Sequence, residues 1–589
     1  MPDGDFRSFT RSEADLHEFG LTMDHLGLVA GMCDELEIIS IIEQQLDNTH
    51  PNMNISSGQA SMAIILNMLN VLQHPLMLAP EFMEKRPIDR LITGSDQQAI
   101  MGEHEITAEH FNQHVLGRTL DRLYDHGLEE LFMTIAGQAY QKFKRFTSRF
   151  LHTDTTSMSV HGSYDDTDDE LIKLTYGFSK DGNHNLKQFL ISMICCDRLP
   201  LFLSTASGNT SDKKYFNELV VEYGNQIRDQ FGDDKIFVFD SAYFTDSNLN
   251  SSGKEIDWIT RVPYTITESK ELKDKLMMEF DNCQDPKLDN YAINSIGMSY
   301  AEIDQRWIVV QSNGKLERDK KSLQKKISKE EEAMASSHSI RNKLQRMEFD
   351  SQDKCMAALS EFQATLKYHR IASVEFEEKV KRTDGKRGRI GEDTPTKIVY
   401  SPVLTLKQDP SRIAMHLITA GRFIIATNVS SEELSDEEVL LAFKSQQNVE
   451  RGFRFLKDPF FFARSIFLEK PERISALAML MGISLLIYNL CELRLREALH
   501  NNNEKFEDPS LGPNENPTIR RVFQTFQGIF IHYTTWKGEL VRENTLNIKP
   551  WHIQVINLLG EIYYNRYKDG IYLEEKYFHA LKSGLSDHG

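Results

Sequence analysis

The stretch "DKIFVFDSAY", residues 234–243, places an acidic residue directly after four consecutive apolar residues. A short, uninterrupted apolar run between polar residues is typical of a strand that is buried on both faces of a sheet. Asp240 ends this strand and therefore lies at the edge of a buried core. The plainer interpretation is that Asp240 is only a turn or N-cap residue before Ser241. The stretch predicts a buried strand whose end carries a carboxylate.

The segments on either side of this strand supply the order of the fold. Residues 149–164 and 169–208 predict three strands separated by turn signals. Residues 212–231 predict an amphipathic helix, and residues 248–263 predict a turn followed by another strand. Three antiparallel strands, a helix, a buried strand and a further strand are the order of a ribonuclease-H-like fold. The expected fold class is therefore α/β, with a mixed sheet flanked by helices.

The length of the chain indicates several domains, because a single core seldom grows beyond roughly 250–300 residues. Helical periodicity prevails at both ends, and a Lys- and Glu-rich helical stretch, residues 316–378, lies between β-like segments. We expect five parts: an α-helical N-terminal domain (1–145), the first part of the core (146–263), a large β/helical insertion with a long helical middle (264–421), the second part of the core (422–499), and a linker with a helical C-terminal tail (500–589).

The net charge of −19 argues against a nucleic acid as the partner, because phosphate binding rewards Lys and Arg. A DNA-binding surface would have to come from local basic residues. The clearest basic run is "KVKRTDGKRGR", residues 379–389, which a solvated loop explains equally well.

Cysteine spacing and hydropathy bear on the compartment. The six Cys form no CxxC pair and no metal-ligand spacing, which indicates reduced thiols in a cytosolic protein. The most apolar stretch, residues 475–490, is shorter than the roughly 18–20 residues that a membrane span needs. We expect a buried core helix there and no association with a membrane.

Three acidic residues are candidates for metal-dependent phosphodiester chemistry. Asp154 lies in the first strand, Asp240 ends the buried strand, and Glu450 lies on a long helix predicted over residues 435–456. Mg²⁺ prefers oxygen ligands, and two such ions about 3.5–4 Å apart can activate a water and stabilise a leaving oxygen. In the plainer interpretation, Asp154 is a turn residue at a strand end, and Glu450 pairs with Arg454 at i+4.

The late stretch "SQQNVERGFRFLKDP", residues 445–459, adds a polar helix face. At about 100° per residue, four side chains lie within an arc of roughly 60°: Phe443, Gln446, Glu450 and Lys457. An aromatic, an amide, an acid and a cation on one face do not form a core stripe. Such a face suits a surface where the acid meets a metal and the lysine meets a phosphate. The same helix predicts basic surface through Arg451, Arg454, Lys457 and Arg464.

Together these residues resemble the DDE transposases of bacterial insertion sequences. The resemblance is to the cut-and-paste branch with the late signature Tyr-x2-Arg-x3-Glu-x6-Lys. Glu450 and Lys457 match this signature, whereas Phe443 replaces Tyr and Gln446 replaces Arg. The segments "HTDTTSMS" and "FVFDSAYF", followed by "WITRVP", resemble the strands of the first two acids. The departures remove a hydroxyl and a bidentate guanidinium, which an amide does not replace.

The resemblance covers nearly the whole chain and implies a ribonuclease-H-like core with an insertion before the catalytic Glu. It implies a dimeric endonuclease and strand-transfer enzyme that acts on double-stranded DNA, both transposon ends and target. A nick would free a 3′-OH, which would form a hairpin and later join to target DNA. Asp154, Asp240 and Glu450 would hold two Mg²⁺ ions, with Mn²⁺ as a substitute. The phosphate contacts near the transposon end would come from Lys457, Gln446, Phe443, Arg451 and Arg454.

The resemblance also implies that the N-terminal domain binds the DNA end or mediates dimerisation. It places the protein in the bacterial cytoplasm, with the nucleoid when bound to DNA. Trp258 and Trp307 are candidates for stacking on a flipped base, although core packing is the stronger interpretation.

Other functions stay open at this point. One alternative is a catalytically inactive or domesticated relative that assembles on DNA ends without cutting. The three intact acids argue against it, and the altered Phe443 and Gln446 favour it. A second alternative is a ribonuclease-H-like nuclease without strand transfer, which the end-binding domain and the insertion argue against. A helical scaffold built around residues 316–378 ignores the acids and ranks last.

Overall fold

The computed structural model describes most of the chain, which divides into two compact units. The first unit comprises Met1–Trp258 and Ala442–Gly589, and the second comprises Ile259–Leu441. The described residues are 10–13, 16–46, 53–71, 74–92, 106–143, 148–162, 164, 172–177, 182, 185–274, 279–385, 387–458 and 468–571.

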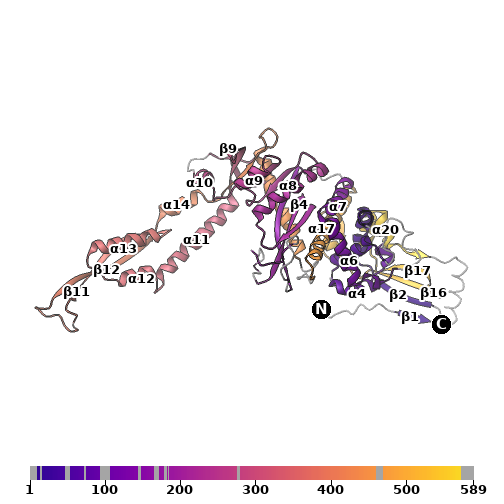
Figure 1. The fold of residues 1–589 in the computed structure, drawn as a ribbon, viewed down its shortest axis with the longest axis horizontal. Helices are drawn as coiled ribbons and strands as arrows, with labels where there is room; N and C mark the ends of the chain where they lie inside the picture. The colour runs from indigo at the N-terminus through magenta and orange to yellow at the C-terminus, as the bar shows by residue number, and fades with distance from the viewer. Residues whose placement is uncertain are drawn as a thin grey trace. The chain divides into compact units, whose positions relative to one another are not determined.

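The first unit contains a mixed sheet in the order β5-β4-β3-β6-β7. Figure 1 labels β4 of this sheet. β3, β4 and β5 are antiparallel neighbours, and β3 pairs with β6 in parallel. Helix α8 connects β5 to β6, so the predicted ribonuclease-H-like order is present and the fold class is confirmed. The bounds are β3 (Phe150–Val160), β4 (Lys187–Cys196), β5 (Leu199–Ser207), α8 (Asp212–Phe231), β6 (Ile236–Phe239), α9 (Asp246–Ser251) and β7 (Asp257–Arg261).

A long buried helix, α17 (Pro471–Asn501), forms the centre of the helical part of this unit and packs against β5, α3, α6 and α7. Among the described helices, only α17 is long and apolar enough to cross a membrane, but 83% of its most apolar window is buried inside the protein. The helix is therefore buried like a core helix, as predicted for residues 475–490. The N-terminal helices are α1 (Leu26–Glu35), α2 (Ile38–Gln45), α3 (Ser57–Leu69), α4 (Ala79–Glu84), α5 (Ile88–Leu91), α6 (Gln113–His126) and α7 (Leu128–Lys142).

A five-stranded sheet in the order β1-β2-β16-β17-β18 joins the two ends of the chain. The sequence predicts only helices in these regions, because short strands that pair across hundreds of residues leave no local periodicity. The segment predicted as a linker folds into the β14–β15 hairpin. The bounds are β1 (Thr10–Glu13), β2 (Leu16–Thr22), β14 (Phe506–Asp508), β15 (Gly512–Asn514), α18 (Ile519–Thr525), β16 (Phe530–Trp536), β17 (Glu539–Leu546), α19 (Pro550–Leu559), α20 (Glu561–Tyr567) and β18 (Gly570–Ile571).

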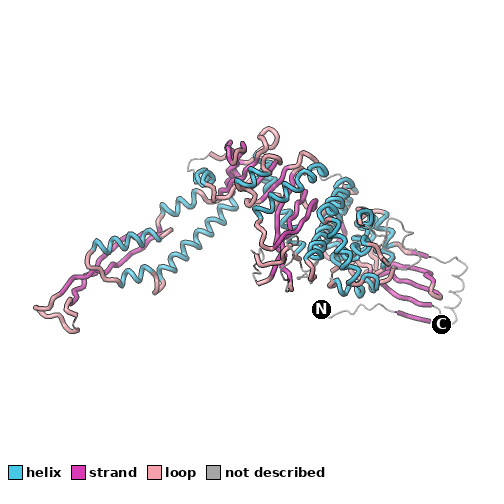
Figure 2. Tube along the Cα trace, in the orientation of Figure 1, coloured by secondary structure: helices cyan, strands magenta, loops and turns pink. Residues whose placement is uncertain are grey.

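The second unit continues from β7 into a sheet of order β7-β13-β10-β9-β8. Helices α11 and α14 connect this sheet to a group of helices and a long two-stranded ribbon, β11–β12 (Figure 2). The bounds are α10 (Thr267–Asp274), β8 (Asp281–Asn282), β9 (Tyr291–Tyr300), β10 (Ile303–Ser312), α11 (Asn313–Ala335), α12 (Ile340–Arg346), α13 (Gln352–Thr365), β11 (His369–Arg382), β12 (Thr396–Gln408), α14 (Pro410–Ile418) and β13 (Arg422–Thr427).

The predicted helical middle of the insertion needs a correction at its C-terminal end. Helical structure ends at Thr365, and residues 369–378 belong to strand β11. The many charged residues in this segment are also typical of an exposed helix. Here they belong to a largely exposed strand, which is stabilised by its pairing with β12. The basic run 379–389 forms the end of β11 and the turn that follows, apart from residue 386, which lies outside the described residues.

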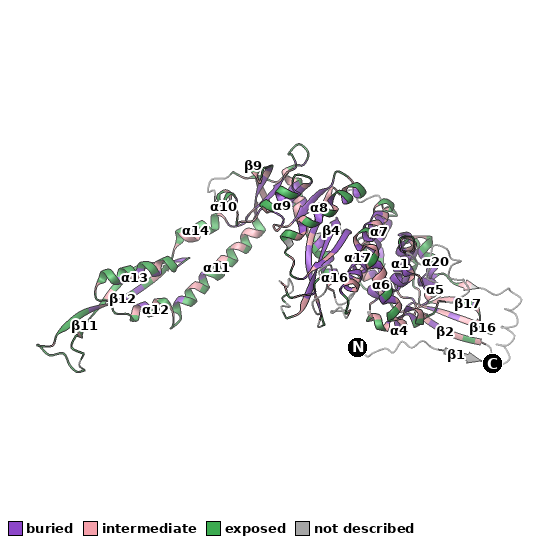
Figure 3. Ribbon diagram, viewed as in Figure 1, coloured by how far each residue is buried: buried purple, intermediate pink, exposed green. Residues whose placement is uncertain are grey.

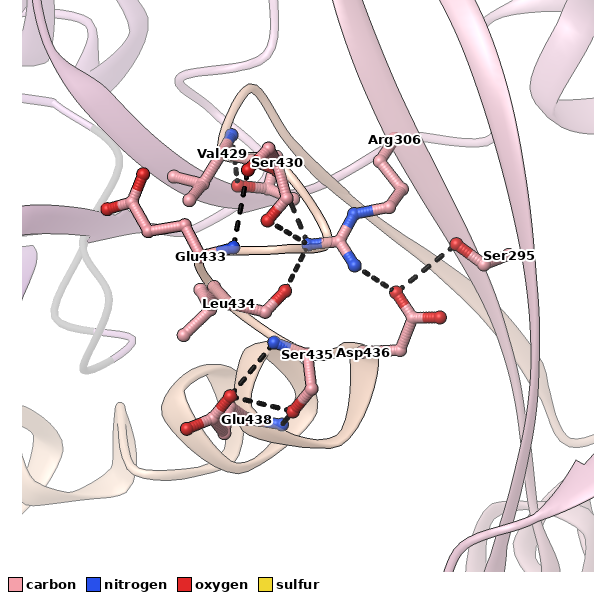
Figure 4. A network of polar contacts seen from close by, with 10 residues as sticks. Ser295, Arg306, Val429, Ser430, Glu433, Leu434, Ser435, Asp436 and Glu438 are labelled. Atoms are coloured by element: carbon pink, nitrogen blue, oxygen red, sulfur yellow. Dashed lines mark hydrogen bonds and ion pairs between the residues drawn. The ribbon is translucent and has the colours of Figure 1, made fainter.

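A polar network in the second unit fixes the start of helix α15 (Asp436–Lys444) (Figure 4). Arg306 on β10 contacts Asp436 at 2.6 Å and donates to the carbonyl oxygen of Leu434 at 2.6 Å. The Ser435 hydroxyl accepts from the Glu438 N–H at 3.3 Å, and the Glu438 carboxylate accepts from the Ser435 N–H at 2.9 Å. This reciprocal pair is a capping box, an arrangement that stabilises the start of a helix.

Candidate active site

Asp154 and Asp240 lie at the same level of two neighbouring parallel strands. The pairs between β3 and β6 include Phe150 with Ile236, and every pair keeps an offset of 86 residues. Asp240 follows Asp154 by the same offset (240 − 154 = 86), one residue beyond the end of β6. Neighbouring strands lie about 4.8 Å apart. The sheet therefore brings together two carboxylates that are far apart in the sequence.

Each of the two carboxylates is oriented by its own backbone. Asp154 Oδ1 accepts a hydrogen bond from the Thr155 N–H at 2.7 Å, and Asp240 Oδ1 accepts one from the Ala242 N–H at 2.8 Å. Both aspartates are half-buried. The turn role suggested by the plainer interpretation of Asp240 is thus present, and it holds the carboxylate in a defined direction.

The residue beneath Asp154 on the same face of β3 is uncharged at neutral pH. His152 lies two residues before Asp154, and side chains two apart in a strand share a face. Burial of its imidazole lowers the pKa of His152 to about 4, so the ring is neutral near pH 7. The two carboxylates therefore receive no compensating positive charge from this histidine.

Helix α16 (Gln447–Leu456) carries Glu450 and packs against β3, β4 and α17. A Cβ added at Gly452 would lie 2.9 Å from Cε of Met193 and 3.2 Å from a side-chain carbon of Leu485. Met193 is the β4 residue that pairs with Asp154. Gly452 thus lets α16 approach the sheet at the level of Asp154, and the exposed Glu450 lies two residues earlier on this helix.

The predicted continuous helix over residues 435–456 is wrong. α15 ends at Lys444 and α16 begins at Gln447, with a turn in which the Gln446 N–H donates to the Phe443 carbonyl oxygen at 3.3 Å. The four residues predicted to share one helix face therefore do not lie on a single helix, because Phe443 and Gln446 precede the start of α16 and Glu450 lies within it. Lys457 is the C-cap of α16 and is half-buried, as are Phe443 and Gln446. The polar residues of this turn are compatible with an exposed helix, so the sequence did not reveal the break.

The exposed face of α16 carries the predicted basic residues. Arg451 and Arg454 are exposed, whereas Arg464 lies outside the described residues. Among the residues that the structure describes, Glu450 has no ion pair with Arg454, so the plainer interpretation of Glu450 as an i+4 partner is not realised. Just beyond Lys457, Asp458 pairs with Arg520 at 3.0 Å.

The donor chemistry fits a divalent cation at the two aspartates. Mg²⁺ prefers oxygen ligands and usually takes only one or two carboxylates from a protein. Within the described ranges, no group of three or more His, Cys, Asp or Glu side chains is arranged to hold a metal ion. The register of β3 and β6 thus places Asp154 and Asp240 at one level, and among the described residues Glu450 does not complete a three-residue ligand group with them.

Both tryptophans considered for base stacking are core residues. Trp258 and Trp307 are fully buried, and the Trp258 indole donates to the Gly253 carbonyl oxygen at 3.0 Å. The Trp258 ring lies edge-on to Tyr243 and Phe244, with ring centroids 6.4 and 6.2 Å apart. Trp258 thus supports the loop that follows Asp240. This supporting role was not predicted from the sequence, although two aromatic residues shortly after an acid at a strand end are a signal for it.

Enlarging Gly452 is expected to impair the site through the position of α16. In Gly452→Leu, the added side chain would meet Met193 and Leu485, and overpacking of this kind costs about 1–3 kcal/mol. We expect a lower melting temperature and reduced DNA cleavage. Gly314→Leu, where an added Cβ meets nothing within 4 Å, is the control and should change neither property. Unchanged cleavage in Gly452→Leu would contradict the importance of this close approach.

Two family models match the sequence of this chain. A family model described as "Transposase DDE domain" matches residues 145–490, which is more than half of the chain. The chain belongs to the DDE transposase family. A second model, "Domain of unknown function (DUF4277)", matches residues 20–137 of this transposase. The resemblance inferred from the acids is therefore confirmed at the level of the family.

No curated protein sequence matches the transposase. A solved structure titled "Cryo-EM structure of piggyBac transposase synaptic complex with hairpin DNA (SNHP)" is similar at 8% identity, with a TM-score of 0.32, over 85% of this chain and 79% of that chain. The family match spans Asp154, Asp240, Glu450 and the whole second unit.

Proposed function

We propose that this transposase cuts at the terminal inverted repeats of its insertion sequence and joins the freed 3′-OH ends to target DNA. DNA is the partner of its family, and the observation that carries the proposal is the placement of Asp154 and Asp240 at one level of β3 and β6. Two carboxylates on adjacent strands are a preformed set of oxygen ligands beside a phosphodiester. Water attack at the transposon end would leave a 3′-OH on one fragment and a 5′-phosphate on the other.

Asp154, Asp240 and Glu450 would hold two Mg²⁺ ions, and Mn²⁺ would serve in their place. Bound cations of this kind activate the attacking oxygen and stabilise the leaving oxygen. The two aspartates supply oriented oxygens, because each carboxylate already accepts a backbone N–H through Oδ1. Glu450 is the third ligand in this proposal, since Gly452 seats its helix against the strand residue that pairs with Asp154.

Residues on and beside α16 would bind the DNA backbone near the transposon end. Arg451 and Arg454 are exposed on this helix, and Lys457 lies at its C-terminal cap. Gln446 and Phe443 stand just before the helix and would make weaker contacts than the Arg and Tyr of the related signature, since an amide lacks the bidentate charged fork. We further propose that the 3′-OH attacks the opposite strand to form a hairpin, that two copies act on paired ends, and that the enzyme works in the bacterial cytoplasm.

A catalytically inactive relative that binds DNA ends is the second candidate. The observation in its favour is that Glu450 does not share a ligand group with the two aspartates among the described residues. A nuclease without strand transfer is the third, and it differs from the main proposal only in the products that it forms.

The proposal is tested by an end-cleavage assay with the full chain and a labelled duplex that carries the element's own end. We expect cleavage at the end with Mg²⁺ or Mn²⁺, none after chelation with EDTA, and a joined product when target DNA is added. Cleavage should return when Mg²⁺ is restored in excess over EDTA, because the carboxylate ligands of the proposal remain in place. Binding without cleavage in either metal would favour the inactive relative, and cleavage without joining would favour a nuclease.

A further inference from the structure

The inserted arm, residues 313–409, has a charge opposite to that of the whole chain. It contains 21 Lys and Arg and 16 Asp and Glu, which gives a net charge of +5 in a protein of net charge −19. Seven of the basic residues and only two acids fall in residues 315–329, most of helix α11. Net charge does not determine local potential, and this helix is a basic site on an acidic molecule.

Four of these basic residues form a stripe along one side of α11, which we call the basic stripe: Arg318, Lys321, Lys325 and Lys329. At 100° per residue they lie within an arc of about 80°. All four are exposed, and at 100° per residue the buried residues Ile327 and Met334 fall on the opposite side of the helix. Figure 3 shows α11 as mostly exposed or intermediate. The stripe spans about 16 Å, a length over which each strand of B-DNA carries about five phosphates.

Four of the five acidic residues of α11 have partners within the second unit, and the fifth, Glu332, is exposed. Glu330 accepts from the backbone N–H groups of Lys367 and Tyr368 at 2.7 and 2.9 Å and contacts His369 at 2.7 Å. Asp319 pairs with Lys315 at 2.5 Å and accepts from the Gly421 N–H at 2.9 Å. Glu330 and Asp319 hold the helix to the rest of the second unit. Of the acids of α11, the exposed Glu332 lies on the outward face, at the end of the basic stripe beyond Lys329.

The basic stripe has no such partners. None of its four residues forms a salt bridge with another residue that the structure describes. Of the acids next to the stripe in sequence, Glu317 pairs with Lys320 at 2.8 Å, and the pKa of Glu317 is lowered mainly by Lys320 and to a smaller extent by Lys321. Like charges three and four residues apart destabilise a helix slightly. Such a row is stabilised by an external anion that lies along it.

We propose that the basic stripe of α11 binds the phosphate backbone of double-stranded DNA, as a second contact surface separate from the acids. The inference rests on DNA being the partner in the proposed function. Lysine is a point charge suited to phosphate oxygens, and contacts of this kind carry no sequence information. The stripe therefore binds DNA whatever its sequence, and it suits flanking or target DNA.

The test compares two triple variants of the full chain that remove the same charge from the same arm. The first is Lys321→Gln/Lys325→Gln/Lys329→Gln on the stripe, and the control is Lys354→Gln/Lys367→Gln/Lys407→Gln at exposed positions off it. Glutamine has nearly the helix propensity of lysine, so the fold is preserved, and thermal melting checks this. The Kd for a labelled duplex of random sequence is measured over a range of salt concentrations, with polyglutamate as a second probe.

The stripe variant is expected to bind the duplex about tenfold more weakly than the control near 0.1 M salt. Its slope of log Kd against log salt should fall by roughly 2 to 3, since each phosphate contact contributes roughly 0.9. Equal Kd and slope in the two variants would overturn the inference. Loss of polyglutamate binding with unchanged DNA binding would overturn it in favour of an acidic protein partner.

The same experiment separates this inference from the proposed function. If the wild type binds no duplex at all, both fail. If the wild type binds and cuts its own end but the two triple variants behave alike, only the role of the stripe fails. If the stripe variant loses random-sequence binding while the wild type binds without cutting, the stripe stands and the catalytic proposal falls.

Discussion

Replacing Asp240 with asparagine is expected to abolish DNA cleavage while the protein stays folded and still binds DNA. The asparagine side-chain oxygen can accept the same hydrogen bond from the Ala242 N–H, so the loop keeps its shape. The negative charge that would hold a cation is lost. We expect a rate decrease of about 10³-fold or more, which corresponds to ~4 kcal/mol of transition-state stabilisation. The measurement is single-turnover cleavage of the element's own end with Mg²⁺, beside a binding assay.

The matched control for this variant is Asp233→Asn. Asp233 is exposed in the turn that precedes β6, at the opposite end of the same strand from Asp240. Its loss removes one charge close by in the sequence and should leave cleavage unchanged. Asp154→Asn should reproduce the Asp240→Asn defect, because the two carboxylates lie at one level of the sheet. Full cleavage by either asparagine variant would remove that aspartate from the mechanism.

Truncating Trp258 is expected to cause the largest loss of stability. The side chain is fully buried, donates to Gly253 and packs edge-on to Tyr243 and Phe244. Replacing a buried large aromatic by alanine typically costs about 3–5 kcal/mol. Trp258→Ala should therefore melt at a clearly lower temperature, as measured by differential scanning calorimetry. Cleavage should fall even below the melting transition, because the loop after Asp240 loses its support.

The control for this prediction is Trp536→Ala. Trp536 is half-buried at the end of β16, where Lys537 lies over its ring at 4.7 Å. Less apolar contact is lost there, so the melting temperature should change much less. Trp258→Phe should fall between the wild type and Trp258→Ala, since it keeps a ring and loses the hydrogen bond. An unchanged melting temperature in Trp258→Ala would show that the packing at this position contributes little.

The fold class could be predicted because its main signals are local. The four apolar residues before Asp240 predict a strand and form β6. The amphipathic pattern of residues 212–231 predicts a helix, and these residues form α8. The terminal sheet could not be predicted, because Thr22 finds its partner at Phe530 and no local window contains both residues. Strand β11 was misread for a different reason: its alternation is obscured by charged residues on both faces, which is also the pattern of an exposed helix.

The candidate acids could be selected from the sequence, but their arrangement could not. Asp154 and Asp240 are brought to one level by the register of β3 and β6, which depends on pairing across the fold. The close approach of α16 depends on the missing side chain of Gly452 against Met193, a contact between distant segments. No Pro or Gly marks the break between α15 and α16, so no such local signal in the sequence predicts it. The roles of Glu450 and Lys457 stay predictions.

The terminal sheet has a consequence for how the enzyme is made on the ribosome. Thr22 pairs with Phe530, a residue synthesised 508 positions later (530 − 22 = 508). At translation rates of 5–20 residues per second, β2 waits for roughly 25 to 100 s before this neighbour emerges. The second unit is contiguous in sequence and is fully synthesised well before that time. A message broken between codons 451 and 529 would therefore encode all three candidate acids in a nascent chain whose strand β2 can pair with β1 but never with β16.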